Sequence, residues 1–154
     1  MKVYKSKSSI AGVGMFAGQD IKKDSTILII KGTMIRDEDT ETDCYLEGPN
    51  WIGITDKIWL IIDKDCPAEY INHSCNPNAG IIGKVTLKAM RDIAKDEEIT
   101  MDYSTTESDE TWQMDCGCGN DNCRHVIKSV QFLSKELIGK YYDYMPTYMK
   151  GVVK

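Results

Sequence analysis

Three cysteines fall within eight residues of one another, Cys116, Cys118 and Cys123, in the spacing C-x-C-x4-C. Thiolates this close can share one tetrahedral zinc ion, and Gly117 between the first two lets the backbone wrap around it. Disulfides or free thiols are the alternative, and we favour zinc. A structural zinc needs four ligands. The candidates for the fourth, on composition alone, are Cys44, Cys66, Cys75 and His125.

A second group of polar side chains occupies residues 72–78, with the sequence NHSCNPN. Such a run could form an ordinary polar turn. It follows Tyr70 and Ile71, however, which have the character of buried residues. Buried Asn and His side chains need hydrogen-bonding partners, so the segment would make a good site for a polar ligand.

Two further segments are ambiguous on their own. Gly12-Val13-Gly14 lacks the third glycine and the following helix of a dinucleotide site, so the pattern favours a hairpin turn over a phosphate cradle. Glu97–Tyr103 is typical of a strand end, where a tyrosine usually belongs to the core.

The elements that must position these residues are mostly strands. Short apolar or alternating runs separated by Gly, Asn and Asp clusters predict strands at Ser25–Lys31, Ile58–Asp63, Val85–Met90 and, as a short edge-like strand, Glu98–Asp102. Apolar residues from Val126 to Leu137 recur at helical spacing, which predicts an amphipathic helix of about three turns that ends near Gly139. The aromatic tail 141–146 is expected to be irregular, and 104–110 to be a loop.

Composition limits the classes of function. A chain of 154 residues fits one domain, and 24 acidic against 19 basic residues give a net charge of −5. This balance argues against a main role on nucleic acid, which needs a basic surface, and suits basic protein partners. No apolar run is long enough for a membrane span, and the first residues lack a secretory apolar segment. We therefore expect an intracellular protein, nuclear or cytoplasmic.

Taken together, the order and spacing of these motifs closely resemble a SET-domain protein-lysine methyltransferase with a post-SET zinc segment. Gly12–Ala17 matches the opening G-x-G-hydrophobic-Phe-Ala of the family, and Asn72–Asn78 matches its N-H-S-C-x-P-N signature. Glu98–Tyr103 matches the E-(L/I)-T-x-D-Y motif, and Cys116–Cys123, followed by Arg124, matches the post-SET zinc segment. Cys44–Leu46 resembles the central tyrosine strand of the family.

The resemblance runs from about Val3 to Ile127 and implies a mainly β fold, the β-clip or SET fold. This fold has small curved β-sheets, a pseudoknot-like crossing that brings the N-H-S-C and E-x-T-x-D-Y segments together and, in this chain, a short C-terminal helix. The implied organisation is a SET domain at 3–114, a post-SET zinc segment at 115–127, and a C-terminal helix and tail at 128–154.

The resemblance also implies S-adenosylmethionine-dependent transfer of a methyl group to a lysine amine. Tyr103 would be the catalytic tyrosine at the mouth of the lysine channel, and Tyr45 would line that channel. The implied cofactor-binding residues are Ala11, Val13, Gly14, Tyr45, Asn72, His73 and Gly117. The implied zinc ligands are Cys75, Cys116, Cys118 and Cys123. Cys44 and Cys66 are left as buried thiols.

The implied substrate is a histone or another protein with a basic tail. The alternative is a catalytically silent, zinc-stabilised module that binds a peptide. Glu69-Tyr70 stand where the family often has Arg-Phe. Met101 stands where the family has an aromatic residue that influences how many methyl groups are added, and because Met cannot hydrogen-bond a water there, we expect more than monomethylation.

Overall fold

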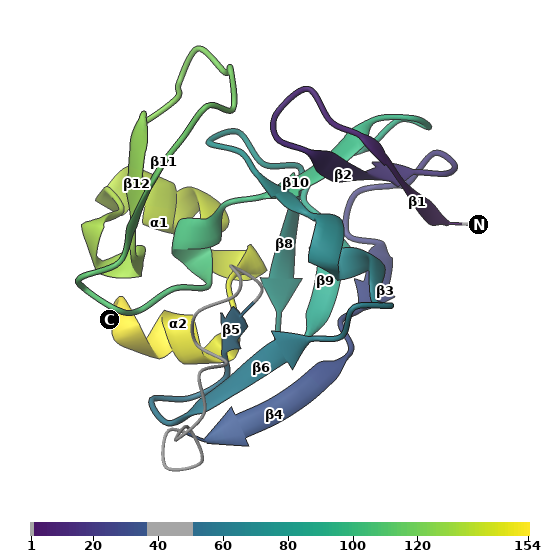
Figure 1. The fold of residues 1–154 in the computed structure, drawn as a ribbon. Coiled ribbons are helices and arrows are strands. Elements are labelled where there is room, and N and C mark those ends of the chain that lie inside the picture. The colour runs from purple at the N-terminus through teal and green to yellow at the C-terminus, as the bar shows by residue number, and fades with distance from the viewer. Residues whose placement is uncertain (1, 37–50) are drawn as a thin grey trace.

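The structure, a computed structural model that describes residues 2–36 and 51–154, is built mainly from short strands (Figure 1). The sheet that carries the two central motifs has the strand order β1-β2-β10-β7. Its strands are β1 (Val3–Lys7), β2 (Val13–Ala17), β7 (Asn72–His73) and β10 (Glu98–Met101). β1 and β2 form a hairpin whose turn contains Gly12, at a φ of +46° that favours glycine.

The pairing of β7 with β10 brings together two motifs that lie far apart in the sequence. The two strands run parallel, with Asn72 opposite Thr100 and His73 opposite Met101. β10 also pairs with β2, so it is an interior strand and not the edge-like strand that its short length suggested. Ile99 and Met15 are completely buried there. Because buried backbone N–H and C=O groups need hydrogen-bonding partners, a strand at this depth pairs on both sides.

Two three-stranded sheets continue the fold, in the orders β3-β9-β8 and β4-β6-β5. Their strands are β3 (Thr26–Ile29), β4 (Gly32–Arg36), β5 (Trp51–Gly53), β6 (Ile58–Ile62), β8 (Ala79–Ile82) and β9 (Thr86–Ala89). The strands predicted at 25–31, 58–63 and 85–90 are therefore present with shortened ends. Apolar residues of these sheets form the main core with Met15, Ala17 and Ile99.

Short helical turns and a small hairpin complete the chain. They are η3 (Pro67–Tyr70), η4 (Tyr103–Thr105), β11 (Gln113–Asp115), β12 (Val126–Lys128), η5 (Val130–Phe132), α1 (Lys135–Tyr141), η6 (Tyr142–Tyr144) and α2 (Thr147–Val152). Within the described ranges, no helix is long and apolar enough to cross a membrane.

The prediction of one helix over the apolar residues 126–137 was wrong. Val126 belongs to β12, Val130 to η5, and the helix begins only after Ser134, whose hydroxyl accepts the Leu137 N–H and so caps the first turn. Gly139 lies inside α1. The tail expected to be irregular continues as η6 and α2. Val130 on η5, Leu133 just after it and Leu137 on α1 reach a common core, whereas Val126 on β12 is exposed, so the helical spacing did not come from one helix.

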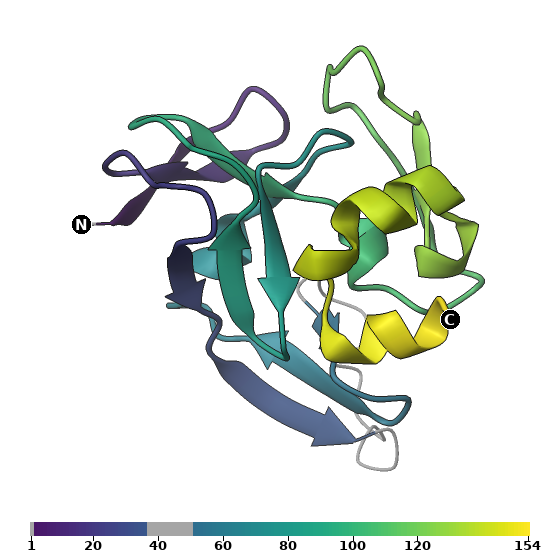
Figure 2. The same ribbon diagram turned by 180° about the vertical axis from the view of Figure 1, so that it is seen from behind.

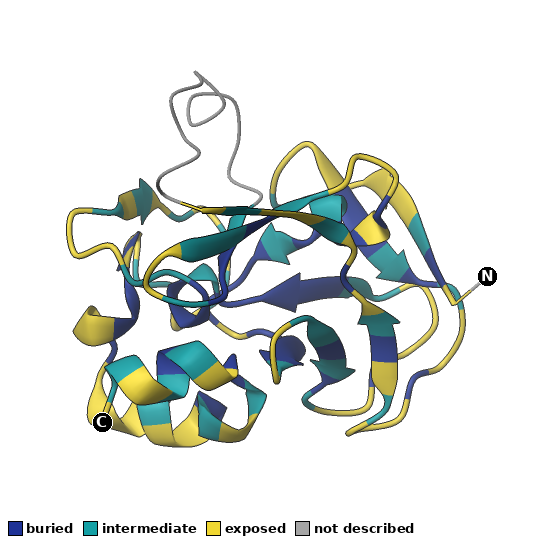
Figure 3. Cartoon of the chain, turned by 90° about the horizontal axis from the view of Figure 1, so that it is seen from below, coloured by how far each residue is buried: buried dark blue, intermediate teal, exposed yellow. Residues whose placement is uncertain are grey.

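The C-terminal helices lie beside the β8 sheet, as Figure 2 shows, and η6 contacts β8. Val130, Tyr141, Met145 and Met149 form a second core there, and each is almost completely buried. A Cβ at Gly80 of β8 would lie 2.6 Å from the backbone oxygen of Tyr144, so the helical segment approaches the strand at backbone contact. Figure 3 shows that the outer faces of the helices are exposed.

Candidate functional site

Tyr103 is the first residue of η4 and is separated from β10 by Asp102. Its hydroxyl donates a hydrogen bond of 2.6 Å to the backbone oxygen of Ile71, the residue before β7. Burial raises the pKa of Tyr103 to about 12, so the phenol keeps its proton at neutral pH. Since its one hydrogen is used by Ile71, the oxygen of Tyr103 is left as an acceptor.

His73 holds the backbone of Tyr103 from the neighbouring strand. The Tyr103 N–H donates to His73 Nδ1 at 3.2 Å, and the two rings meet edge to face with centroids 5.4 Å apart. Burial lowers the pKa of His73 to about 4; Asp102 opposes this shift and Arg124 adds to it. The ring is therefore neutral, and because Nδ1 accepts, the hydrogen is on Nε2, 3.4 Å from Cys75 Sγ.

The side chain of Asn72 joins the β1–β2 turn to β10. Its amide nitrogen donates to the backbone oxygens of Ala11 at 3.0 Å and Val13 at 3.4 Å. The same nitrogen also donates to Glu98 Oε1 at 2.8 Å. The structure thus brings together Ala11, Val13 and Asn72, three residues that the sequence assigned to one cofactor site.

Glu98 lies at the centre of this group, and the sequence analysis gave it no role. Its carboxylate accepts from the Ser8 hydroxyl at 2.8 and 2.9 Å as well as from Asn72. Gly14 lies against it, because a Cβ at Gly14 would stand 2.3 Å from Glu98 Oε1. The alternation of β10 could have identified Glu98, since Ile99 is buried and its neighbour must face the other side of the sheet.

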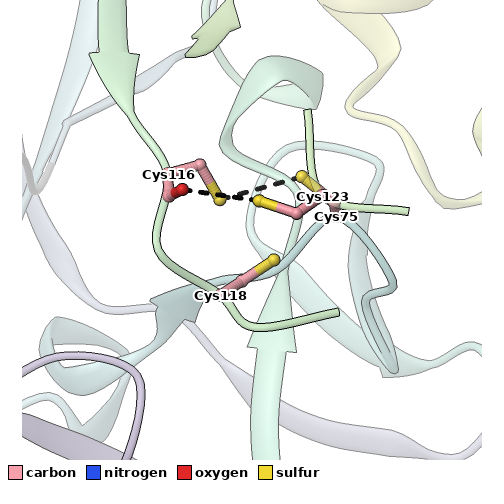
Figure 4. A group of neighbouring side chains, drawn as sticks. All are labelled: Cys75, Cys116, Cys118 and Cys123. Atoms are coloured by element: carbon pink, nitrogen blue, oxygen red, sulfur yellow. Dashed lines mark hydrogen bonds between the residues drawn. The ribbon is translucent and has the colours of Figure 1, made fainter. Parts of the chain in front are cut away.

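Four cysteine sulfurs point toward one another between the β7 loop and the segment after β11 (Figure 4). The Sγ atoms of Cys75, Cys116, Cys118 and Cys123 all lie within 4.8 Å of one another. The Cys75 and Cys116 sulfurs are 3.8 Å apart. Four thiolates around zinc at about 2.3 Å would be separated by about 3.8 Å, so the donor set and its spacing fit this metal.

The surroundings of three of the four cysteines also suit thiolates. Backbone N–H groups of Arg124 and His125 donate to Cys75 Sγ and Cys123 Sγ at 3.3 and 3.4 Å. Burial raises the pKa of Cys118, but hydrogen bonds from Asn120 and the backbone outweigh it and lower the pKa to about 6. Burial raises the pKa of Cys116. None of the cysteines that the structure describes is in a disulfide.

The remaining predicted residues lie apart from the cluster or outside the described ranges. Cys66 is a buried free thiol, as expected, and its sulfur accepts the Lys31 N–H at 3.5 Å. Gly117 is exposed, and a Cβ there would meet nothing within 4 Å, so its contact with a cofactor stays a prediction. Tyr45 and Cys44 lie outside the residues that the structure describes.

Comparison with known proteins gives this site a family. Residues 12–104 match the family model described as the SET domain. The chain is 34% identical over 137 residues to Histone-lysine N-methyltransferase 2D of Homo sapiens, covering 79% of this chain and 2% of that protein. It is 35% identical over 136 residues to Histone-lysine N-methyltransferase trr of Drosophila melanogaster, covering 79% of this chain and 6% of that protein.

A third relative is Histone-lysine N-methyltransferase, H3 lysine-4 specific, of Chaetomium globosum, 33% identical over 137 residues. The match covers 79% of this chain and 13% of that protein. The chain therefore spans only a small part of the length of these curated relatives.

Proposed function

The chain belongs to the SET domain family, and on that premise we propose that it is a protein-lysine N-methyltransferase that uses S-adenosylmethionine. The observation that carries the proposal is the parallel pairing of β7 with β10. Next to this pairing, the Tyr103 hydroxyl donates to the Ile71 carbonyl. The adjacent residue, Asn72, donates to the Ala11 backbone oxygen in the turn that is proposed to bind the cofactor.

The role proposed for Tyr103 follows from its hydrogen bond. Its oxygen can accept an N–H of a lysine amine, and because its proton is already donated to Ile71 it does not compete for the amine lone pair. A free lysine amine has a pKa near 10.4, so a site that excludes water favours the neutral nucleophile. Holding this amine in line supplies much of the rate enhancement. Tyr45 would line the same channel.

The group around Asn72 would bind the amino-acid end of the cofactor. The carboxylate of Glu98 and the backbone oxygens of Ala11 and Val13 are acceptors suited to an α-ammonium group. When bound, S-adenosylmethionine supplies a sulfonium methyl group; transfer to the amine forms the N–C bond, breaks the C–S bond and leaves the electron pair on sulfur. Gly14 keeps the β2 backbone close to Glu98 because a larger residue would displace the carboxylate.

The four cysteines would hold a structural zinc ion. Cys75 comes from the β7 loop and the other three from the segment after β11, so one ion would fasten that segment beside Tyr103. We keep the division into a SET domain at 3–114, a post-SET segment at 115–127 and a C-terminal part at 128–154. The second core makes the C-terminal part an integral layer of the molecule.

The substrate class that we propose is a protein with a basic tail, and histones are the first to test. The relatives are named for histone-lysine methylation, and the net charge of −5 of this chain suits a basic partner. Neither observation selects the target lysine.

Two measurements test the proposal together. S-adenosylmethionine at one hundred times its Kd should stabilise the fold by about 2.7 kcal/mol, seen as a rise in melting temperature. Radiolabelled S-adenosylmethionine should label core histones or a protein of a cell lysate. Stabilisation without label in any protein would favour a silent binding module, and the absence of both would refute the cofactor site.

A further inference from the structure

Arg124 contacts both the cysteine cluster and the segment that carries Tyr103. It directly follows Cys123, and its backbone N–H and Nε donate to Cys75 Sγ at 3.3 and 3.4 Å. At its other end, Nη2 donates to Asp102 Oδ1 at 2.7 Å and Nη1 to Ser104 Oγ at 3.3 Å. Asp102 and Ser104 are the two sequence neighbours of Tyr103.

Among the described residues, Arg124 is the only cation that contacts Asp102. His73 Nδ1 also lies 3.7 Å from Asp102 Oδ1, but the His73 ring is neutral. Its side chain is 1% exposed, whereas that of Arg124 is 22% exposed. Asp102 Oδ1 also accepts the Ser104 N–H at 3.1 Å and so begins η4, while Oδ2 has no hydrogen-bond partner in the described part of the chain. Loss of the guanidinium would therefore leave a buried carboxylate without compensation beside the catalytic tyrosine.

The sulfur of Cys75 is also linked to Tyr103 by a second route. His73 donates from Nε2 to Cys75 Sγ and accepts the Tyr103 N–H at Nδ1. The backbone of the tyrosine is thus held on one side by His73 and on the other by the Asp102–Arg124 pair, and both supports end on the same sulfur atom.

We propose that Arg124 is a positioning residue that ties the metal ligand Cys75 to the segment 102–104, so that metal occupancy of the cysteine cluster sets the placement of Tyr103. The link between the metal ligand Cys75 and the segment 102–104 does not depend on the proposed function; only its effect on methyl transfer does. A metal ion bound by Cys75 and Cys123 fixes the sulfur that Arg124 contacts and the backbone from which Arg124 extends. Because the donors of the planar guanidinium have a fixed geometry, the hydrogen bond from Nε to Cys75 Sγ also sets where Nη2 holds Asp102 Oδ1.

The experiment must separate this link from simple neutralisation of Asp102. Arg124→Lys keeps a positive charge beside Asp102, but one ammonium group cannot replace the fixed fork that reaches both the sulfur and the carboxylate. The double variant Arg124→Gln/Asp102→Asn removes both charges, and Asn retains the acceptor that caps η4. The matched control is Arg91→Lys, which makes the same change in the half-exposed ion pair of Arg91 with Glu97.

Three readouts are measured on zinc-loaded protein. The first is zinc release to a chromogenic chelator, the second is amide hydrogen exchange of the peptide covering 98–106, and the third is kcat and KM for methyl transfer. Outer contacts to metal ligands are typically worth 10–100-fold in metal affinity or activity. We expect both Arg124 variants to release zinc about tenfold faster, to exchange faster over 98–106 and to lose about tenfold in kcat with little change in KM.

Wild-type zinc retention or wild-type exchange in the Arg124→Lys variant, matching Arg91→Lys, would overturn the inference. Wild-type zinc retention in the double variant Arg124→Gln/Asp102→Asn would also overturn the inference, because it would show that Arg124 only neutralises Asp102. The two proposals fail in different ways. If the wild-type protein transfers no methyl group but zinc release and exchange change as expected, the link stands and the proposed function falls.

Discussion

Gly14→Ala tests the geometry of the proposed cofactor site. The added Cβ would lie 2.3 Å from Glu98 Oε1 and 2.8 Å from its Cδ. A carbon and an oxygen that are not bonded normally stay about 3.3 Å apart, so the carboxylate must move by about 1 Å. A displacement of this size breaks the 2.8 Å hydrogen bonds that Glu98 accepts from Asn72 and Ser8.

The expected magnitude follows from those two bonds. Hydrogen bonds to a charged group contribute about 1.5–3 kcal/mol each, and water replaces part of this because the site is only partly buried. We therefore expect the free energy of unfolding to fall by about 2 kcal/mol. Because Asn72 loses its fixed orientation, the Kd for S-adenosylmethionine should rise about tenfold, which corresponds to about 1.4 kcal/mol.

Isothermal titration calorimetry and urea unfolding measure the two effects. The control is Gly139→Ala on the exposed side of α1, where a Cβ meets nothing within 4 Å. It should stabilise the helix by about 0.5–1 kcal/mol and leave the cofactor Kd unchanged. A Gly14→Ala protein with wild-type stability and wild-type Kd would show that Glu98 does not organise the site.

Three further substitutions test other parts of the structure. Tyr141→Phe removes one of two donors to the Cys75 backbone oxygen, at 3.3 Å, while Asn122 keeps the other at 3.0 Å, and should lower the free energy of unfolding in urea by about 0.5–1.5 kcal/mol; an unchanged midpoint would contradict the contact. Met145→Ala in the second core should cost about 2–5 kcal/mol, and a loss below 1 kcal/mol would argue that the C-terminal helices are loosely attached. Met101→Tyr should shift the product toward monomethyl-lysine in mass spectra, because its hydroxyl can bind a water in the proposed lysine channel, and an unchanged product ratio would disprove that role.

The sequence was most informative where residue type alone determines the chemistry. Cysteine spacing predicted a metal site, and the family signature selected Cys75 over Cys66; the structure brings the Cys75 sulfur into the cluster. The strand runs were also recognisable, because β-branched and apolar residues recur between turn residues. Glu98 was overlooked because a strand carboxylate is usually a solvated surface group, and its partners Ser8 and Asn72 are 90 and 26 residues away.

The C-terminal part was least predictable, for a physical reason. Apolar residues at helical spacing need only reach a common core, and here Val130 and Leu137 do so from η5 and α1. The close approach of η6 to Gly80 depends on a tertiary contact; a glycine in a strand can mark a close approach, but it does not indicate which segment approaches. The same applies to Arg124, whose partners Cys75 and Asp102 are distant in sequence but adjacent in space.

In the proposed mechanism, the Tyr103 hydroxyl, held on the Ile71 carbonyl, orients the lysine amine that receives the methyl group. The most direct measurement is the rate of label transfer from S-adenosylmethionine to core histones by the wild-type protein and by Tyr103→Phe, with cofactor binding measured on both. We expect Tyr103→Phe to bind S-adenosylmethionine nearly as well as wild type and to transfer label at least a hundredfold more slowly, which corresponds to about 2.7 kcal/mol in the barrier. Equal rates of transfer by the two proteins would refute the role of the Tyr103 hydroxyl.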